Sequence, residues 1–285
     1  SQNPLEVINA HKAYGYGLTG SGTQIAILDG GFWTGHDEMD GKTITTYGPV
    51  QAASASEDHG LFVSSVAAGE DDDSGMQGVA PLASLHISDY DQLNGNTYFP
   101  THWANATNDA SSAVVQNNSW GVDYQVDTLI SDIVADGWTN AYGVAQKWNS
   151  VGFTANEAST TSYISALNNF QSHGVIVYAL SNNSTYTDAD FQAALPELFP
   201  QLNEAWITAV NIEITGSSGS EVYTRKSAPC GSTAQYCLGA DGWELNGAVY
   251  NASGGNHYSQ GSGTSFVAPQ ISGAVALLAE AFPNH

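Results

Sequence analysis

The stretch QIAILDGG, at residues 24–31, is the clearest strand signal in this chain of 285 residues. Its apolar run from Ile25 to Leu28 is typical of a strand buried on both faces, as in a parallel sheet. The run ends at Asp29, and two glycines follow. A carboxylate in this place lies at the carboxyl end of its strand, where open α/β sheets position their functional groups. The stretch therefore predicts a central strand and a candidate site residue.

Outward from this stretch, short apolar runs alternate with helix-like segments, as in α/β proteins. Further strands are predicted at residues 85–87, 113–115, 175–180 and 206–214, and helices at residues 61–67, 159–172 and 266–282. Pro269 fits the last helix only if that helix begins just before it. We predict one α/β domain over residues 1–285, with a mostly parallel central sheet flanked by helices on both faces. Residues 122–158, polar and rich in Gly and Asn, are expected to form an elaborated surface excursion.

The charge is strongly negative, with 28 Asp and Glu against five Lys and Arg and a net charge of −23. Five scattered cations cannot neutralise several phosphates or an anionic membrane surface, which excludes nucleic-acid binding. No stretch approaches the roughly 18–20 apolar residues of a membrane span, so we expect no membrane insertion. A soluble monomer suited to a dilute or salty extracellular medium fits this composition.

The two cysteines, Cys230 and Cys237, are seven residues apart, with no further Cys or His beside them to complete a metal site. We expect a small disulfide loop, which stabilises the fold by roughly 2–3 kcal/mol in the chain-entropy model. Such a bond indicates an oxidising compartment and supports an extracellular location.

Three polar residues fall where a parallel sheet places reactive groups. Asp29 ends a strand, His59 opens a helix, and Ser265 stands at the N-terminus of the final buried helix. A serine there has an unpaired N–H and the positive end of the helix dipole beside it, which favours a nearby oxyanion. Asn182, directly after the strand at 175–180, offers a second donor. Each residue alone is typical of a turn or a cap, but the order Asp, His, Ser makes the combination specific.

Five sequence blocks resemble, in order, those of the subtilisin-like serine proteases, or subtilases. They are IAILDGG at 25–31, DHG at 58–60, GVAP at 78–81, NNSWG at 117–121 and GTSFVAP at 263–269. The resemblance spans about residues 19–283. Residues 13–22, GMQGVAP at 75–81, the cysteine loop and AFPN at 281–284 are similar to the subtilases carried by bacterial autotransporters. The resemblance implies a secreted endopeptidase, extracellular or on the bacterial cell surface, that acts on protein or peptide substrates without a catalytic cofactor.

The resemblance also implies a role for each site residue. Ser265 would be the nucleophile, His59 its general base and then acid, and Asp29 the residue that orients His59. Asn182 and the N–H of Ser265 would form the oxyanion hole. An extended substrate backbone would pair, as an added β-strand, with Ser119, Trp120 and Gly121.

The chain departs from the family's pattern beside the triad. Gly30 follows the aspartate where the family usually has Thr or Ser, which removes a hydroxyl near the carboxylate. Leu61 and Phe62 replace the Thr and His of the usual His-Gly-Thr-His, and Phe266 and Val267 replace the usual Met and Ala. Such changes in the support of a site commonly lower the rate rather than abolish it, so we expect an active enzyme.

Two acidic groups offer oxygen ligands for a structural Ca²⁺. Glu38 falls near a calcium ligand of some subtilisins, and an acidic run follows at Asp71, Asp72 and Asp73. Such a run before Ser-Gly is also typical of a solvated turn, and its spacing is not diagnostic. Calcium therefore stays an open alternative.

Two other functions remain as alternatives. A sedolisin-type acid serine peptidase, related in fold, would have a carboxylate at the position of Asn182 and no need for His59. A peptide-binding module with a subtilase fold would keep the groove and lose the chemistry. The intact set of Asp29, His59, Asn182 and Ser265 argues against both.

Overall fold

The computed structural model describes residues 4–217 and 219–283. Its strands are β1 (Gln24–Asp29), β2 (Ile44–Tyr47), β3 (Ser84–Asp89), β4 (Val115–Asn118), β5 (Val175–Ala179), β6 (Trp206–Thr215), β7 (Val222–Arg225), β8 (Cys237–Ala240), β9 (Leu245–Val249) and β10 (His257–Gly261). In this part of the chain, eight of them form one sheet, with neighbours in the order β2-β3-β1-β4-β5-β6-β7 and with β8 also pairing β6. Every pair in this sheet is parallel except β6–β7. The predicted mostly parallel sheet is confirmed.

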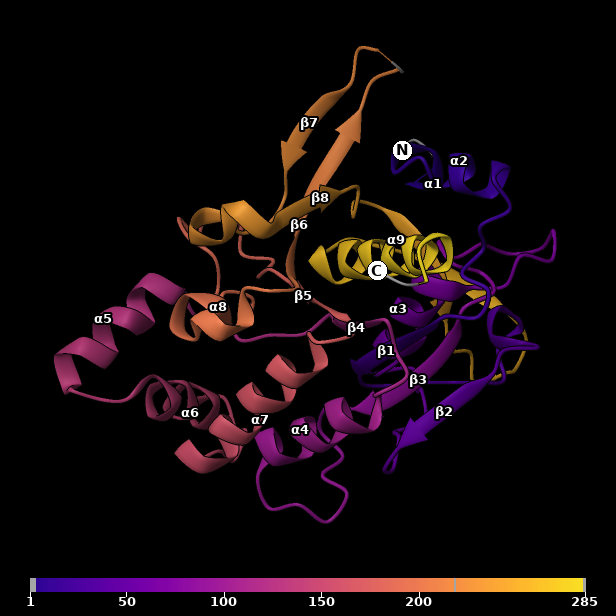
Figure 1. Cartoon of the computed structure of the whole chain (residues 1–285). Helices are drawn as coiled ribbons and strands as arrows, with labels where there is room; N and C mark the ends of the chain where they lie inside the picture. Colours follow the sequence, from indigo (N-terminus) through magenta and orange to yellow (C-terminus); the bar gives the residue numbers. More distant parts are fainter. Residues whose placement is uncertain (1–3, 218, 284–285) are drawn as a thin grey trace.

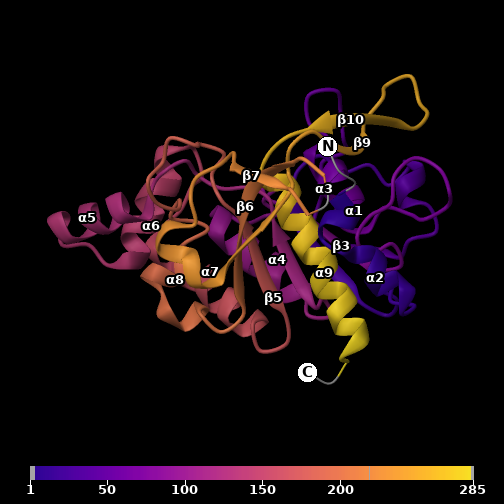
Figure 2. The same ribbon diagram turned by 90° about the horizontal axis from the view of Figure 1, so that it is seen from above.

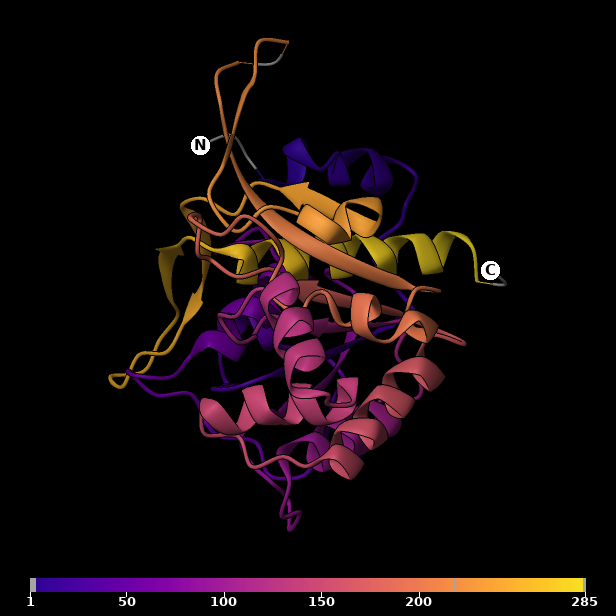
Figure 3. The ribbon, with the colours of Figure 1, turned by 90° about the vertical axis from the view of Figure 1, so that its left-hand side faces the viewer.

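Helices cover both faces of this sheet. They are α1 (Pro4–Val7), α2 (Ala10–Gly15), α3 (His59–Ala68), α4 (Phe99–Asp109), α5 (Val126–Asp136), α6 (Asn140–Ser150), α7 (Glu157–Phe170), α8 (Leu195–Leu198) and α9 (Val267–Ala281), with 3₁₀ turns η1 (Asp37–Met39), η2 (Pro200–Leu202), η3 (Gly231–Tyr236) and η4 (Thr264–Phe266). Figure 1 shows α3 and α9 on one face and α4 and α7 on the other. The hairpin of β6 and β7 projects from the body (Figures 1 and 3).

The first strand shows why its sequence is apolar without alternation. Ile25 and Ile27 belong to the core layer that includes residues of α3 and α9. Ala26 and Leu28 belong to the layer that includes residues of α4 and α7. Because both faces of β1 are covered, every side chain of the run is buried, as a central parallel strand requires.

Two predictions about elements differ from the structure. The strand predicted at 113–115 is β4, shifted to Val115–Asn118, whose last three residues are polar but buried. Hydrogen bonds satisfy these side chains, for example from Asn118 Nδ2 to the carbonyl of Val177 at 3.2 Å. An apolar pattern cannot mark such a strand.

The segment at 122–158, expected as a surface excursion, contains α5 and α6, which lie together at one end of the molecule (Figures 1 and 2). Leu129, Ile133, Val144 and Trp148 from these helices are buried in the core layer of α4 and α7. The apolar residues of α5 and α6 form only narrow stripes among polar neighbours, so the composition of the segment does not indicate two buried helix faces.

The predicted disulfide and the predicted start of the last helix agree with the structure. Cys230 and Cys237 are disulfide-bonded. The last helix begins at Val267, so Pro269 lies in its first turn, where the missing N–H costs no helical hydrogen bond. No helix in the described ranges combines the length and the apolar character needed to cross a membrane.

Candidate active site

The end of β1 and the start of α3 bring Asp29 and His59 together. The first two backbone N–H groups after His59 donate to the carbonyls of Gly30 and Gly31, at 2.6 and 3.0 Å. These bonds tie the first turn of α3 to the residues directly after β1. As a result, Nδ1 of His59 lies 2.7 Å from Oδ1 of the buried Asp29. This is the geometry of a carboxylate that orients an imidazole.

The second oxygen of Asp29 lacks the donor that a hydroxyl would supply. Oδ1 also accepts from the N–H of Gly30 at 2.8 Å, whereas the buried Oδ2 has no hydrogen-bond partner among the described residues. A Cβ at Gly30 would lie 3.3 Å from the Tyr90 ring and 3.6 Å from Oε1 of Glu57. The absence of a side chain at Gly30 therefore lets Tyr90 and Glu57 approach the end of β1, beside Asp29 and His59.

The charges around His59 favour its protonated form. Burial lowers the pKa of the imidazole, but the charge and hydrogen bond of Asp29 raise it, and Glu57 and Asp58 raise it further. The net result is a pKa above the ordinary value for histidine. The ring is still 35% exposed, so it remains accessible from solvent. A site of this kind stabilises the imidazolium that forms when a histidine takes a proton from a nucleophile.

Ser265 lies in η4, directly before α9, at the same edge of the sheet. Its Oγ donates to the carbonyl of Ser119 at 3.0 Å, and Oγ of Ser119 donates to the carbonyl of Ser265 at 2.9 Å. No hydrogen bond among the described residues joins Ser265 to His59. The centroids of the His59 and Phe266 rings nevertheless lie 5.8 Å apart, and Phe266 is the next residue after Ser265. Catalytic hydrogen bonds are often unformed in a site without substrate, so this rotamer is compatible with catalysis.

The side-chain amide of Asn182 is held beside Thr264, in the lining of the cavity that Ser265 also borders. Its Oδ1 accepts from the N–H and Oγ1 of Thr264, at 2.9 and 3.1 Å. Holding the oxygen in this way fixes the amide and leaves Nδ2 free to donate. The N–H of Ser265 donates to no group within the described residues. Two unpaired donors, one from Asn182 and one from Ser265, thus border one cavity.

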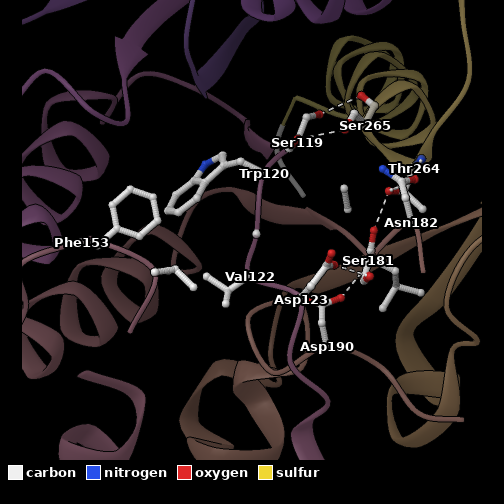
Figure 4. Close-up of a pocket in the computed structure, with 14 residues that line it drawn as sticks. Ser119, Trp120, Val122, Asp123, Phe153, Ser181, Asn182, Asp190, Thr264 and Ser265 are labelled. Carbon is white, nitrogen blue, oxygen red and sulfur yellow. Dashed lines mark hydrogen bonds between the residues drawn. The ribbon is translucent and has the colours of Figure 1, made fainter. Parts of the chain in front are cut away.

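This cavity has a volume of about 380 Å³ and opens beside Ser265 and Asn182 (Figure 4). No backbone hydrogen bond in the described part of the chain uses Trp120 or Gly121. The segment is therefore available to pair with an extended peptide. The residues that line the cavity are Ser119, Trp120, Gly121, Val122, Asp123, Val151, Phe153, Ala179, Leu180, Ser181, Asn182, Asp190, Thr264 and Ser265.

The aromatic departures from the family's pattern form one packing unit. Phe62 of α3 and Phe266 of η4 pack with ring centroids 4.1 Å apart and an interplanar angle of 31°. Together with Val66 and Leu245 they make a small apolar cluster beside His59. The two large rings therefore pack against each other, and the ring of Phe266 also lies beside the ring of His59.

The candidate calcium ligands do not converge. Oε1 of the buried Glu38 accepts from the N–H of Met76 and the hydroxyl of Tyr258, at 2.9 and 2.8 Å, and burial raises the pKa of this carboxyl. The run at 71–73 lies on an exposed loop, where Asp72 accepts from the N–H of Ser74. No group of three or more His, Cys, Asp or Glu able to share a metal occurs in the described ranges. The buried Oε2 of Glu38 lacks a hydrogen-bond partner, yet these side chains do not form a calcium cage.

Sequence reasoning missed three acidic residues of this region. Glu57 lies beside the His59–Asp29 pair, and Asp123 and Asp190 line the cavity. Asp123 and Asp190 lie outside the described helices and strands, so no periodic pattern marks them. The one available signal is sequence proximity, because Asp123 follows the NNSWG block by two residues.

Comparison with known proteins places the chain in a family. The sequence profile of the Subtilase family matches residues 20–285. An "Extracellular serine protease" of Serratia marcescens is 27% identical over 98% of this chain and 30% of its own length. Fervidolysin of Fervidobacterium pennivorans is 24% identical over 98% of this chain and 38% of its own length. The chain thus spans about a third of these curated relatives.

Solved structures show the same fold. That of fervidolysin superposes with a TM-score of 0.68 at 21% identity, covering 99% of this chain and 40% of that one. Sphericase gives a TM-score of 0.64 at 22% identity, covering 94% and 80%. With a family profile that matches almost the whole sequence, and with this α/β architecture, the chain belongs to the subtilase family.

Proposed function

We propose that this protein is a serine endopeptidase that hydrolyses peptide bonds of proteins through an acyl-enzyme at Ser265. His59 takes the proton of Ser265 Oγ during attack and later gives it to the leaving amine, and Asp29 keeps the ring oriented and stabilises the imidazolium. The observation that carries this proposal is the 2.7 Å hydrogen bond between His59 and Asp29, at the sheet edge that also holds Ser265.

The other groups of the site have matching tasks. For attack, Ser265 rotates about its Cα–Cβ bond, away from the Ser119 carbonyl and toward His59. The substrate carbonyl oxygen becomes an oxyanion, which accepts hydrogen bonds from Asn182 Nδ2 and the Ser265 N–H. The substrate backbone pairs with the free backbone groups of Trp120 and Gly121.

A fluorophosphonate tests the mechanism directly, because it labels only an activated serine. Intact mass and peptide mapping are measured from pH 4 to pH 9 on folded protein, on heat-unfolded protein, on Ser265→Ala and on Ser131→Ala. Ser131 lies on α5 and bonds only within that helix, so its variant is the matched control. We expect a single adduct on Ser265, in folded protein only, with labelling that declines as His59 becomes protonated.

One observation favours a second candidate, a peptide-binding module without turnover: Ser265 Oγ is engaged by the Ser119 carbonyl. The absence of any adduct from pH 4 to pH 9, combined with stable binding of an intact peptide, would establish that function instead. Labelling and activity confined to low pH would support the sedolisin-type peptidase.

We also propose that the protein works outside the cell, as an autotransporter-type subtilase. The disulfide, the acidic surface and the similarity to a relative named an extracellular protease support this location. Immunoblotting of culture supernatant and cell fractions of the native host tests it, and a purely intracellular protein would contradict it.

A structural Ca²⁺ stays a proposal that rests on Glu38 alone. Its test is the melting temperature with Ca²⁺ and with EGTA, for the wild type and for Glu38→Gln. A calcium-dependent increase in the wild type that is absent in the variant would establish the ion. Equal melting temperatures would exclude it.

A further inference from the structure

The cavity beside the nucleophile carries two carboxylates. Figure 4 shows Asp123 and Asp190 together at the end of the cavity away from Ser265, with Trp120 and Phe153 along a wall. The chemistry of this end therefore differs from that of the end that holds the two oxyanion donors. The cavity therefore presents aromatic side chains along one wall and carboxylates at the end away from Ser265.

Both carboxylates are fixed in place. Asp190 is 1% exposed, and its two oxygens accept from the N–H groups of Ser181 and Ala193, at 2.6 and 3.1 Å. Asp123 is exposed, and its Oδ1 accepts from Oγ of Ser181 at 2.5 Å. Its Oδ2 makes no hydrogen bond within the described residues. Ser181 thus holds both acids, and one carboxylate oxygen remains available to a ligand.

No cation of the protein neutralises this pair. Within the described ranges, neither Asp123 nor Asp190 forms an ion pair with Lys, Arg or His. The few basic residues are engaged elsewhere: Lys42 with Glu70, Lys147 with Asp132, Lys226 with Glu213, Arg225 with the Ser227 carbonyl, and Lys12 in a separate cavity beside α1 and α2. Adjacent carboxylates without a counter-ion favour a cationic ligand, because unpaired charges are costly to desolvate.

We propose that this cavity binds the Lys or Arg side chain that precedes the cleaved peptide bond. This inference rests on the proposed function and names the substrate class of that same site. The aliphatic part of the side chain packs on Trp120, Val122 and Phe153, and its cationic end binds Asp123 and Asp190. The cavity volume of about 380 Å³ lies within the range of about 300–1,000 Å³ of ligand pockets.

The state of Asp190 agrees with this ligand. Burial raises its pKa to about 7, while the N–H groups of Ala193 and Ser181 counteract that increase. A bound ammonium or guanidinium favours the ionised carboxylate and lowers the pKa again. A substrate with an acidic side chain would instead add a further negative charge, and a neutral one would leave both acids without a counter-ion.

Matched peptides test the preference. Four substrates differ only in the residue before the scissile bond, which is Arg, Lys, citrulline or norleucine, and kcat/KM is measured for each. Citrulline has the shape of Arg without its charge. For the wild type we expect kcat/KM for Arg to exceed that for citrulline by at least about 30-fold. In Asp123→Asn that ratio falls at least tenfold. In Asp136→Asn, which removes the same charge from an exposed site on α5 outside the cavity, the ratio is unchanged.

A binding measurement separates this inference from the catalytic proposal. p-Aminobenzamidine, a fluorescent cation, is titrated into Ser265→Ala and into Ser265→Ala with Asp123→Asn, so that no turnover is needed. We expect saturable binding to the first and binding at least tenfold weaker to the second.

Equal kcat/KM for Arg and citrulline, or an unchanged ratio in Asp123→Asn, would overturn the inference even if fluorophosphonate labels Ser265. Conversely, binding of the probe by a protein that the fluorophosphonate does not label would support an acidic pocket for a cationic side chain and refute the protease mechanism.

Discussion

Replacing Asn182 by Asp removes one hydrogen-bond donor and keeps an acceptor oxygen in place. The two side chains have nearly the same shape, so we expect a carboxylate oxygen to accept from the N–H and Oγ1 of Thr264, which lie 2.9 and 3.1 Å from Oδ1 of Asn182 in the wild type. The Nδ2 donor is replaced by a negatively charged oxygen beside the developing oxyanion. We therefore expect the variant to fold normally and to lose transition-state stabilisation.

The size of the loss follows from the number of donors. Removing one of two oxyanion donors costs about 2.7–4 kcal/mol, or about 10²–10³-fold in kcat, a range established on a subtilisin and carried over here. Asn182→Ala makes a similar kcat loss and in addition leaves the buried Thr264 N–H without its acceptor. An unsatisfied buried donor costs about 1–3 kcal/mol of stability. The Ala variant should therefore melt at a lower temperature, and the Asp variant should not share this deficit.

The assay measures kcat and KM separately on one peptide substrate, together with the melting temperature. Asn183→Ala is the matched control, because Asn183 is next in the chain but does not line the cavity, and we expect its kcat to equal that of the wild type. A kcat within about fivefold of wild type in both Asn182 variants would refute the role of this amide in an oxyanion hole. A raised KM with unchanged kcat would instead assign Asn182 to substrate binding.

Three further changes probe the support of the site. A Cβ at Gly263 would lie 3.2–3.3 Å from the amide of Asn182. Gly263→Ala should therefore displace this donor and lower kcat about tenfold or more, with little change in melting temperature. An unchanged kcat would show that the amide adapts to the methyl group. Glu57 raises the pKa of His59, and in the proposed mechanism activity is lost as pH falls through that pKa because the imidazolium cannot accept a proton. Glu57→Gln should therefore move the acid limb of kcat/KM to lower pH, and an unshifted limb would contradict the electrostatic role. Replacing Cys230 and Cys237 by Ser should lower the free energy of unfolding, measured in urea, by about 2–3 kcal/mol. A change well below 1 kcal/mol would indicate that the loop is already ordered without the disulfide.

The elements that can be predicted are those buried on both faces, because such burial favours an uninterrupted apolar run in the sequence. The run from Ile25 to Leu28 is apolar throughout because helices cover both faces of β1, and the first half of α9, from Val267 to Gly273, is likewise buried throughout. In contrast, the polar β4 is invisible to an apolar pattern because its buried amides are satisfied by hydrogen bonds that come from other strands and helices, such as the one from Ser272 to Asn117.

The helices α5 and α6 were missed for a different reason. Each places only a narrow apolar stripe, such as Leu129 and Ile133, against the core, within an otherwise polar sequence. Whether such a stripe is buried depends on the surface that it meets, and other elements of the same core layer, such as α4 and α7, build that surface only in the folded chain.

The amino-acid sequence alone predicts the α/β class and three candidate reactive residues: Asp29 at a strand end, His59 at a helix start, and Ser265 before a buried helix. These assignments depend on local signals, because strand ends, helix starts and glycines each have local physical causes. That Asp123 and Asp190 share one cavity with Ser265 is visible only in the folded chain. The two residues come from loops about 70 residues apart, and a carboxylate in a loop has no periodic pattern that would mark it. Only folding brings them together in one cavity without a counter-ion.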